Sequence, residues 1–293
     1  MRISSIYRAG QPVISFEFFP PKTPEGERKL YESAAELKEL HPAFVSVTYG
    51  AMGNTQANTL RVVSEIRNRI GIETAAHLTC VAHSRGEISG ILEKLAAARI
   101  ENIVALRGDP PQGETEFRPV ADGFRHASEL VKFIRSCSRF GEAFDLIVAG
   151  YPEGHPECRD LRKDLEHLKI KVDAGANAVN TQLFFENGFY FDFVERARKA
   201  GITVPIVPGI MPVTHGPQIE KFSKMCGTKI PGEIRRAIER FGDDQDSIIR
   251  FGIDYATRQC RGLLDGGAPG LHFYTLNQSR ATRKIYSNLG LAD

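Results

Sequence analysis

Residues 13–21 read VISFEFFPP, an apolar segment with a single charged residue, Glu17, shortly before two prolines. The Val, Ile and Phe residues predict a strand over 13–19. Side chains alternate along a strand, so Glu17 lies on one face, while Phe16 and Phe18 lie on the other and suit packing against helices. Charged side chains are rarely buried without a partner or a use. Residue spacing alone favours neither of two interpretations of Glu17. It is either half of a buried ion pair with a lysine or arginine, or a catalytic group.

Further strand-sized segments follow, separated by stretches of helical periodicity. The predicted strands continue at 44–50, 74–80, 102–109, 145–152, 178–185, 205–212 and 271–277. The predicted helices are 25–40, 56–70, 86–98, 123–139, 159–174, 187–200, a longer helical region over 215–265, and 279–289. Strand followed by helix, eight times over, is typical of the α/β class and of a (β/α)8 TIM barrel. A doubly wound open sheet is the alternative, but no strand leads into a GxGxxG turn.

Composition narrows the class of protein. The 293 residues are 42% hydrophobic and 25% charged, with a net charge of +2, which is normal for a globular protein and indicates neither a nucleic-acid nor a membrane partner. The N-terminus has no apolar signal core, and the five scattered cysteines are typical of reduced thiols in a cytoplasmic protein. His155 and Cys158 have no second ligand pair, so we expect no metal. We expect a homo-oligomer with one barrel domain over 1–293.

In such barrels the chemistry lies at the carboxyl ends of the strands. Polar or aromatic residues stand at those ends: Glu17, Thr48, Tyr49, His77, Thr79, Arg107, Gly108, Asp109, Tyr151, His155, Gln182, Met211, Pro212, Tyr274 and Asn277. A ring of them on one rim is hard to explain by stability alone. Several aromatic and imidazole groups together indicate a flat, polar, conjugated ligand such as a flavin or a pterin.

Two sets of residues suit an anionic ligand. Arg107 is of the type that clamps phosphates or carboxylates, and Gly108 lets a ring or a pyrophosphate approach the backbone; a local ion pair that caps the strand is the alternative. On the helix after the fifth strand, Asp164, His167 and Lys171 form a polar line at i, i+3 and i+7. This spacing is more typical of a solvated helix face, but such a line also suits a ribose and a pyrophosphate.

Nine short segments, in order and across nearly the whole chain, resemble the methylenetetrahydrofolate reductase family. They are SFEFFPPK, FVSVTYGA, HLTC, NIVALRGDPP, YPEGHPE, KVDAGAN, TQLFF, PGIMPV and LHFYTLN. The resemblance implies a barrel with non-covalent FAD and a ping-pong reduction of 5,10-methylenetetrahydrofolate to 5-methyltetrahydrofolate by NADH or NADPH, which supplies methyl groups for methionine synthesis. Eukaryotic relatives add a C-terminal regulatory domain, for which we expect no room in this chain.

The resemblance also implies roles for individual residues. Glu17 matches the general acid, and Asp109 matches an aspartate near the flavin and the pterin. Cofactor contacts are implied for Thr48, Tyr49, Ala51, His77, Arg107, Gly108, Asp109, Ala127, Tyr151, His155, Asp164, His167 and Lys171, and substrate contacts for Asp109, Gln182, Gln218 and Phe222. Some relatives have asparagine in place of His167. Where some have an arginine that contacts the folate tail, this chain has Gln278, with Arg280 two residues on, so the tail anchor stays open.

The implied chemistry needs a proton on N10 of the folate, because the five-membered ring must open before it accepts hydride. We expect the phenylalanines around Glu17 to raise its pKa by desolvation, so that it stays protonated near neutral pH. Asp109 would keep a negative charge near the flavin and steady the cationic iminium.

Two other functions fit the barrel. A pterin-binding barrel that transfers a one-carbon group without redox chemistry would share the carboxylates and need no flavin. A catalytically silent barrel would act as a subunit or binding module, but the combination of Glu17, Asp109 and Gln182 argues against it.

Overall fold

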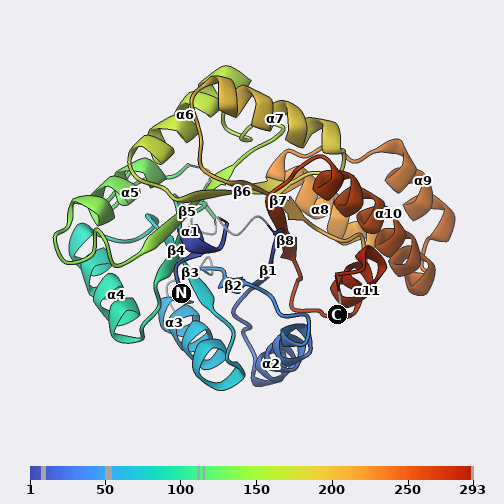
Figure 1. Ribbon diagram of the computed structural model, residues 1–293, viewed down its shortest axis with the longest axis horizontal. Coiled ribbons are helices and arrows are strands. Elements are labelled where there is room, and N and C mark those ends of the chain that lie inside the picture. The colour runs from blue at the N-terminus through green and yellow to red at the C-terminus, as the bar shows by residue number, and fades with distance from the viewer. Residues whose placement is uncertain (8–10, 50–54, 111–112, 115, 292–293) are drawn as a thin grey trace.

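The strands close on themselves in sequence order. The computed structural model describes residues 1–7, 11–49, 55–110, 113–114 and 116–291, and in it eight parallel strands form a closed barrel from β1 to β8. Figure 1 shows this ring with the helices around its outside. The predicted (β/α)8 barrel is therefore confirmed.

All eight predicted strands are present, and each ends earlier than predicted. They are Val13–Phe18 (β1), Phe44–Val47 (β2), Thr74–Thr79 (β3), Asn102–Leu106 (β4), Asp145–Gly150 (β5), Ala178–Leu183 (β6), Ile206–Ile210 (β7) and Gly270–Tyr274 (β8). The residues beyond each end leave the hydrogen-bonded ladder and enter the connections at the barrel mouth, where binding residues of such barrels lie.

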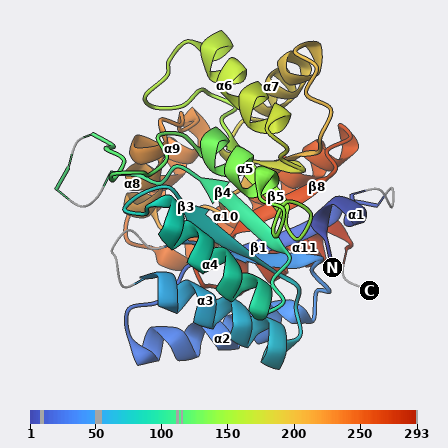
Figure 2. The same ribbon diagram turned by 90° about the vertical axis from the view of Figure 1, so that its left-hand side faces the viewer.

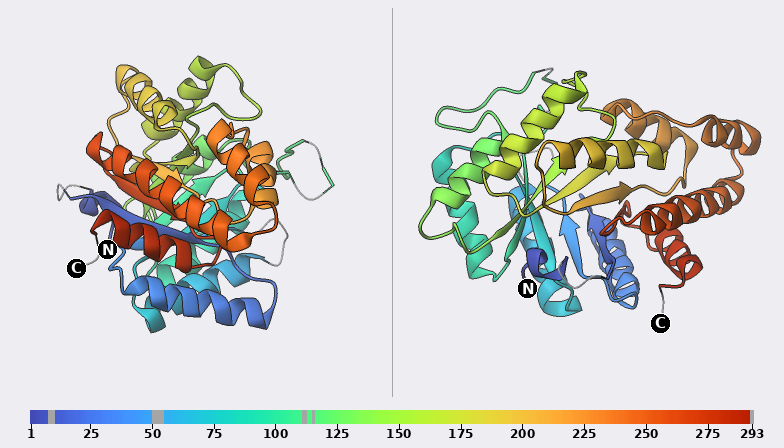
Figure 3. Two further views of the ribbon diagram at one scale, coloured as in Figure 1. Left: turned by 90° about the vertical axis from the view of Figure 1, so that its right-hand side faces the viewer. Right: turned by 45° about the horizontal axis from the view of Figure 1, so that its top comes forward.

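The helices also follow the predicted periodicity. They are Pro24–Lys38 (α2), Thr55–Glu65 (α3) with the π-helical turn Ile66–Ile70 (η1), Arg85–Ala97 (α4), Ala127–Ser136 (α5), Leu161–Asp173 (α6), Asn187–Lys199 (α7), Gly216–Cys226 (α8), Gly232–Phe241 (α9), Gln245–Asp265 (α10) and Arg280–Leu289 (α11). The helical region over 215–265 is divided into α8, α9 and α10, and Figure 3 shows α10 and α11 side by side on the outside of the barrel. None of the helices described is both long and apolar enough to cross a membrane.

The alternation expected for β1 is confirmed. Phe16 and Phe18 are buried in the main hydrophobic core, which also contains Leu30 and Leu37 of α2. Glu17 instead contacts side chains of other strands inside the barrel. Burying a phenylalanine side chain contributes about 1.5–3 kcal/mol, so the apolar face holds the strand and fixes which way Glu17 points.

A short helix that the sequence pattern did not predict closes the amino end of the barrel. This helix, Ile3–Ile6 (α1), buries Ile3 in a small interior cluster with Val13 and Phe44. The Ile3 amide donates a hydrogen bond to Asn102 Oδ1 at 3.0 Å. Figure 2 shows α1 at one end of the barrel and the connection after β4 at the other. Among the described residues, α1 therefore covers the amino end of the barrel and leaves the carboxyl ends of the strands as the side where a ligand is expected.

Gly209 of β7 lets a tyrosine lie across the barrel interior. A Cβ at this position would stand 2.3 Å from the Thr181 carbonyl oxygen and 2.7 Å from the hydroxyl oxygen of Tyr274. That hydroxyl donates to the same carbonyl at 2.6 Å, so neither neighbour is free to move away.

We expect Gly209→Ala to lower the free energy of unfolding by about 1–3 kcal/mol through overpacking, measured by urea denaturation. Gly90→Ala in α4 is the matched control, because a Cβ there meets nothing within 4 Å. The control should stabilise by about 0.5–1 kcal/mol. Equal effects of the two substitutions would contradict the packing described for Gly209.

Candidate active site

Glu17 lies in a cluster of polar side chains from four strands. Its Oε2 atom accepts a hydrogen bond from Ser46 Oγ at 3.1 Å and lies 3.1 Å from His77 Nε2 and 3.4 Å from His272 Nε2. Behind His272, its Nδ1 atom is 2.8 Å from Ser15 Oγ. The partner of Glu17 is therefore a pair of imidazoles rather than the lysine or arginine weighed from the sequence. We call Glu17, His77, His272, Ser15 and Ser46 the Glu17 cluster.

The structure overturns the expected pKa of Glu17. Burial alone would raise this pKa, but the charge of His77 and the hydrogen bond and charge of His272 outweigh burial and lower the pKa of Glu17 well below its ordinary value. The phenylalanines cannot shield the carboxylate as expected, since Phe16 and Phe18 lie on the opposite face of β1. Glu17 is thus a carboxylate at neutral pH in the ligand-free protein.

Arg107 and Gly108 form a rigid corner after β4. The Arg107 guanidinium makes two hydrogen bonds to Glu157, at 2.6 and 2.8 Å, and lies over the ring of Phe117. Gly108 has φ of +87°, and a Cβ there would come within 2.9 Å of Val81 Cγ1. Only glycine fits this turn, which leaves the backbone beside Arg107 open to close approach.

The rim beside this corner is polar and aromatic. Tyr151 and His155 meet edge to face with ring centroids 4.6 Å apart. Burial raises the pKa of Tyr151, and the negative charges of Asp109 and Asp164 raise it further. Asp109 itself is exposed. The structure thus brings three of the predicted site residues, His155, Asp109 and Asp164, near the phenol of Tyr151.

Lys171 is a partly buried cation beside this rim. Its Nζ atom donates to the carbonyl oxygen of Ala149 at 2.5 Å. Burial lowers its pKa to about 8, while the carboxylate of Asp164 opposes that shift. Burial also raises the pKa of Asp164, and the charge of Lys171 lowers it. Two partly desolvated groups of opposite charge on α6 are poised to meet a ligand that carries both hydroxyls and an anion.

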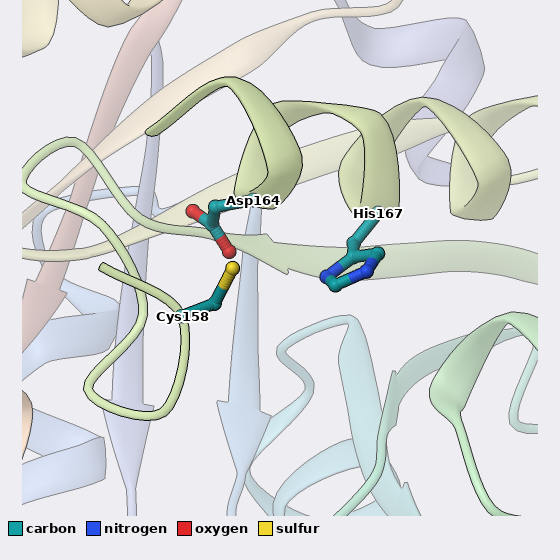
Figure 4. Close-up of side chains that lie close together, drawn as sticks. All are labelled: Cys158, Asp164 and His167. Carbon is teal, nitrogen blue, oxygen red and sulfur yellow. The ribbon is translucent and has the colours of Figure 1, made fainter. Parts of the chain in front are cut away.

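Figure 4 shows Asp164 and His167 of α6 pointing toward Cys158 from the preceding connection. One ligand atom of each lies within 4.8 Å of the others, a set that would also suit a metal ion. The resemblance assigns Asp164 and His167 to the cofactor instead. His167 is exposed, as a solvated helix face predicts, whereas Asp164 is not.

The other predicted site residues line the same mouth. Tyr49 pairs through its hydroxyl with His83 Nε2 at 2.6 Å, and Gln182 folds back so that its Oε1 accepts from the Leu183 amide at 2.8 Å. Thr48 follows β2, Ala127 begins α5, and Gln218 and Phe222 lie on α8. Phe222 packs on the apolar cluster that includes Tyr274. Ala51 lies outside the described residues.

Sequence reasoning missed part of the Glu17 cluster. His272 stands two residues before Tyr274, so strand alternation alone places both on the inner face. The alternation in LHFYTLN thus carried a signal for His272. Alternation along residues 13–19 likewise places Ser15 on the face of Glu17. Glu157 carried no signal, since its bond to Arg107 joins two connections that are distant in sequence.

The fold and this mouth define a class of protein: a (β/α)8 barrel with a buried carboxylate–imidazole cluster beneath a basic and aromatic rim. Comparison with known proteins narrows this class to one family. The sequence profile of the methylenetetrahydrofolate reductase family matches residues 2–290. The chain belongs to the methylenetetrahydrofolate reductase family.

Two relatives show how much of the family's length is shared. The chain is 41% identical to "Methylenetetrahydrofolate reductase (NADH) 1" of Arabidopsis thaliana, over 100% of this chain and 50% of the relative. It is 39% identical to "5,10-methylenetetrahydrofolate reductase" of Escherichia coli K12, over 96% of this chain and 92% of the relative. The chain thus spans about half the length of the plant protein and most of the bacterial one.

Among solved structures, an uncharacterized protein from Clostridium thermocellum is similar, with a TM-score of 0.60. That protein binds two copies of 5-methyl-5,6,7,8-tetrahydrofolic acid. The two chains are 15% identical, and the match covers 98% of this chain and 96% of that one. At this identity the likeness shows the fold alone.

Proposed function

We propose that this chain reduces 5,10-methylenetetrahydrofolate to 5-methyltetrahydrofolate, with hydride from a nicotinamide passed through bound FAD in a ping-pong cycle. The observation that carries the proposal is the Glu17 cluster in a chain that matches the family over residues 2–290. The name of the plant relative specifies NADH, which makes NADH the first donor to test against NADPH. The product would supply methyl groups for methionine synthesis in the cytoplasm, with the barrel acting as one catalytic domain of a homo-oligomer.

The residues at the mouth suit FAD. Gly108 takes a left-handed turn in which any Cβ would collide with Val81 or Thr79, and this turn fixes the course of the backbone after Arg107. Two buried polar atoms, Thr79 Oγ1 and Asn180 Oδ1, have no hydrogen-bond partner in the protein. A ligand with both donors and acceptors would satisfy them. Arg107 and Lys171 match the charge of a pyrophosphate, and the flat rings of Tyr49 and Tyr151 match a conjugated one. Bound FAD would supply the centre that accepts and returns hydride.

The protein's own part in the reaction is proton delivery and charge stabilisation. Three contacts converge on Glu17 Oε2, so Oε1 is the oxygen left to face N10 of the folate. A proton delivered there opens the ring and leaves a cationic iminium. The exposed carboxylate of Asp109 is placed to stabilise that cation, and Gln182 can exchange its bond to its own backbone for one to the pterin.

Substitution of Glu17, the proposed general acid, should slow the folate half-reaction and leave the NADH half-reaction nearly unchanged. We expect purified protein to be yellow and to bleach with NADH. In rapid mixing, Glu17→Gln should keep flavin reduction by NADH within about twofold and slow transfer to methylenetetrahydrofolate by about 10²–10⁴-fold, the range of general acid catalysis.

Glu36→Gln, an exposed glutamate of α2, is the matched control and should leave both steps unchanged. A Glu17→Gln protein that reduces folate at the wild-type rate would remove the acid role. A colourless protein that stays inert with added FAD would instead favour the one-carbon transferase or the silent barrel.

The pH dependence of FAD affinity should report Lys171. Its side chain, with a pKa of about 8, is cationic below that pH and neutral above it. Binding of a pyrophosphate favours the cation, so above pH 8 each bound FAD takes up a proton. The Kd for FAD should then rise by up to about tenfold per pH unit until the ordinary lysine range is reached.

Titration of cofactor-free protein with FAD, followed by flavin fluorescence, measures this slope. Lys171→Met should weaken binding at pH 7 and remove the slope. Lys169→Met is the control, because Lys169 on the same helix pairs with Asp173. A slope that survives in Lys171→Met would assign the proton to another group.

A further inference from the structure

His272 is the most deeply buried titratable member of the Glu17 cluster, and neither the resemblance nor the rim pattern gives it a role. Its side chain is 1% exposed, against 9% for His77 and 16% for Glu17. It comes from β8, beside β1, where its Cα pairs with that of Ser15. Both ring nitrogens have a partner: Nδ1 lies 2.8 Å from Ser15 Oγ, and Nε2 lies 3.4 Å from Glu17 Oε2.

The surroundings of His272 leave few charges to compete with Glu17. Phe44 of β2 stacks on one side of the ring, and Tyr274 of β8 meets it edge to face. Burial keeps that tyrosine neutral by raising its pKa. From the paired strand β7, Gly209 stands opposite His272 and brings no charge. In the described part of the chain, the titratable groups that face the ring are therefore Glu17, His77 and Tyr274.

The two histidines differ in how they meet Glu17. His77 Nε2 is near the carboxylate but lacks hydrogen-bond geometry and is a buried atom without a hydrogen-bond partner. His272 Nε2 does form a hydrogen bond to Oε2, and the serine behind it suits either charge state of the ring. The Ser15 hydroxyl can accept from Nδ1–H both in the imidazolium and in the neutral ring that has given up its Nε2 proton. Of the two histidines, His272 thus keeps Nδ1 paired whether or not Nε2 carries a proton.

We infer that His272, backed by Ser15, is the proton reserve of Glu17 in the proposed reaction. The pair starts as carboxylate and imidazolium. When the folate covers the carboxylate, the Nε2 proton moves to Glu17, and Glu17 releases a proton to N10. The pair then holds a carboxylate and a neutral imidazole, one proton fewer, and solvent restores that proton after the product leaves. His272 touches neither folate nor cofactor, so it is a positioning and proton-supplying residue.

The inference rests on the proposed function, and its test uses the FAD-loaded protein. The rates of flavin reduction by NADH and of transfer to methylenetetrahydrofolate are measured separately by rapid mixing across pH 5–9. His272→Asn should slow the folate step by about 10²-fold, with loss of its pH dependence, and leave flavin reduction within about twofold. His41→Asn, at an exposed histidine, is the control and should change neither step.

Ser15→Ala provides a milder variant in case His272→Asn does not fold. The Ser15 hydroxyl can accept a hydrogen bond from Nδ1–H of the imidazolium, so its removal should make that cation easier to deprotonate. The pH at which the folate step declines should therefore move down, while the rate at low pH is kept. A merely structural role for Ser15 would lower the rate at every pH without moving that midpoint.

A readout without turnover checks the same coupling. In cofactor-free protein with ¹⁵N-labelled histidine, the His272 signal should show Nε2 protonated, and its midpoint should move to lower pH in Glu17→Gln. Unchanged pH profiles in His272→Asn and Ser15→Ala, or a His272 signal indifferent to Glu17→Gln, would overturn the role of His272. A wild-type protein that bleaches with NADH but never reduces folate would overturn the proposed function instead, and the NMR result would stand apart from it.

Discussion

The negative charge of a carboxylate inside a barrel needs nearby groups that offset it. The rest of the site depends on which groups do so for Glu17. The apolar face of β1 is fixed by Phe16 and Phe18 in the core, so Glu17 has nowhere to point except inward. Ser46 of β2, His77 of β3 and His272 of β8 then contact its carboxylate, and Ser15 of β1 contacts His272 from behind. Because α1 closes the amino end, this cluster meets ligands only from the carboxyl end, where the predicted cofactor residues lie.

The mouth of the barrel has two sides that differ in their chemistry. One side, built around Arg107, Gly108 and Lys171, has charges and open backbone that suit the phosphates and ring of a cofactor. The other side, above β1 and β8, has the Glu17 cluster, to which we assign the supply of protons. A hydride carrier and a proton donor must approach one substrate from different directions, and strands on different parts of the barrel wall provide this arrangement.

Much of the fold could be predicted from the sequence, because helical periodicity and the alternation of side chains along a strand are local properties. Eight apolar segments with helical stretches between them predicted the barrel, and alternation correctly turned Glu17 inward. The pKa of Glu17 could not be predicted, since it depends on His77 of β3, which reaches Glu17 from beyond β2, and on His272 of β8, which closure of the barrel brings beside β1. Two further contacts could not be predicted for the same reason, since each joins segments that are distant in sequence. They are the pairing of Arg107 with Glu157 and the packing of α1 against the amino end of the barrel.

The most direct test of the central claim is a solvent isotope effect on each half of the reaction. Reduced protein is mixed rapidly with methylenetetrahydrofolate in H₂O and in D₂O, and oxidised protein is mixed with NADH in the same two solvents. If the Glu17 cluster supplies a proton as the folate ring opens, only the folate step slows in D₂O. Equal folate rates in the two solvents, at matched positions on the pH profile, would contradict proton delivery by Glu17.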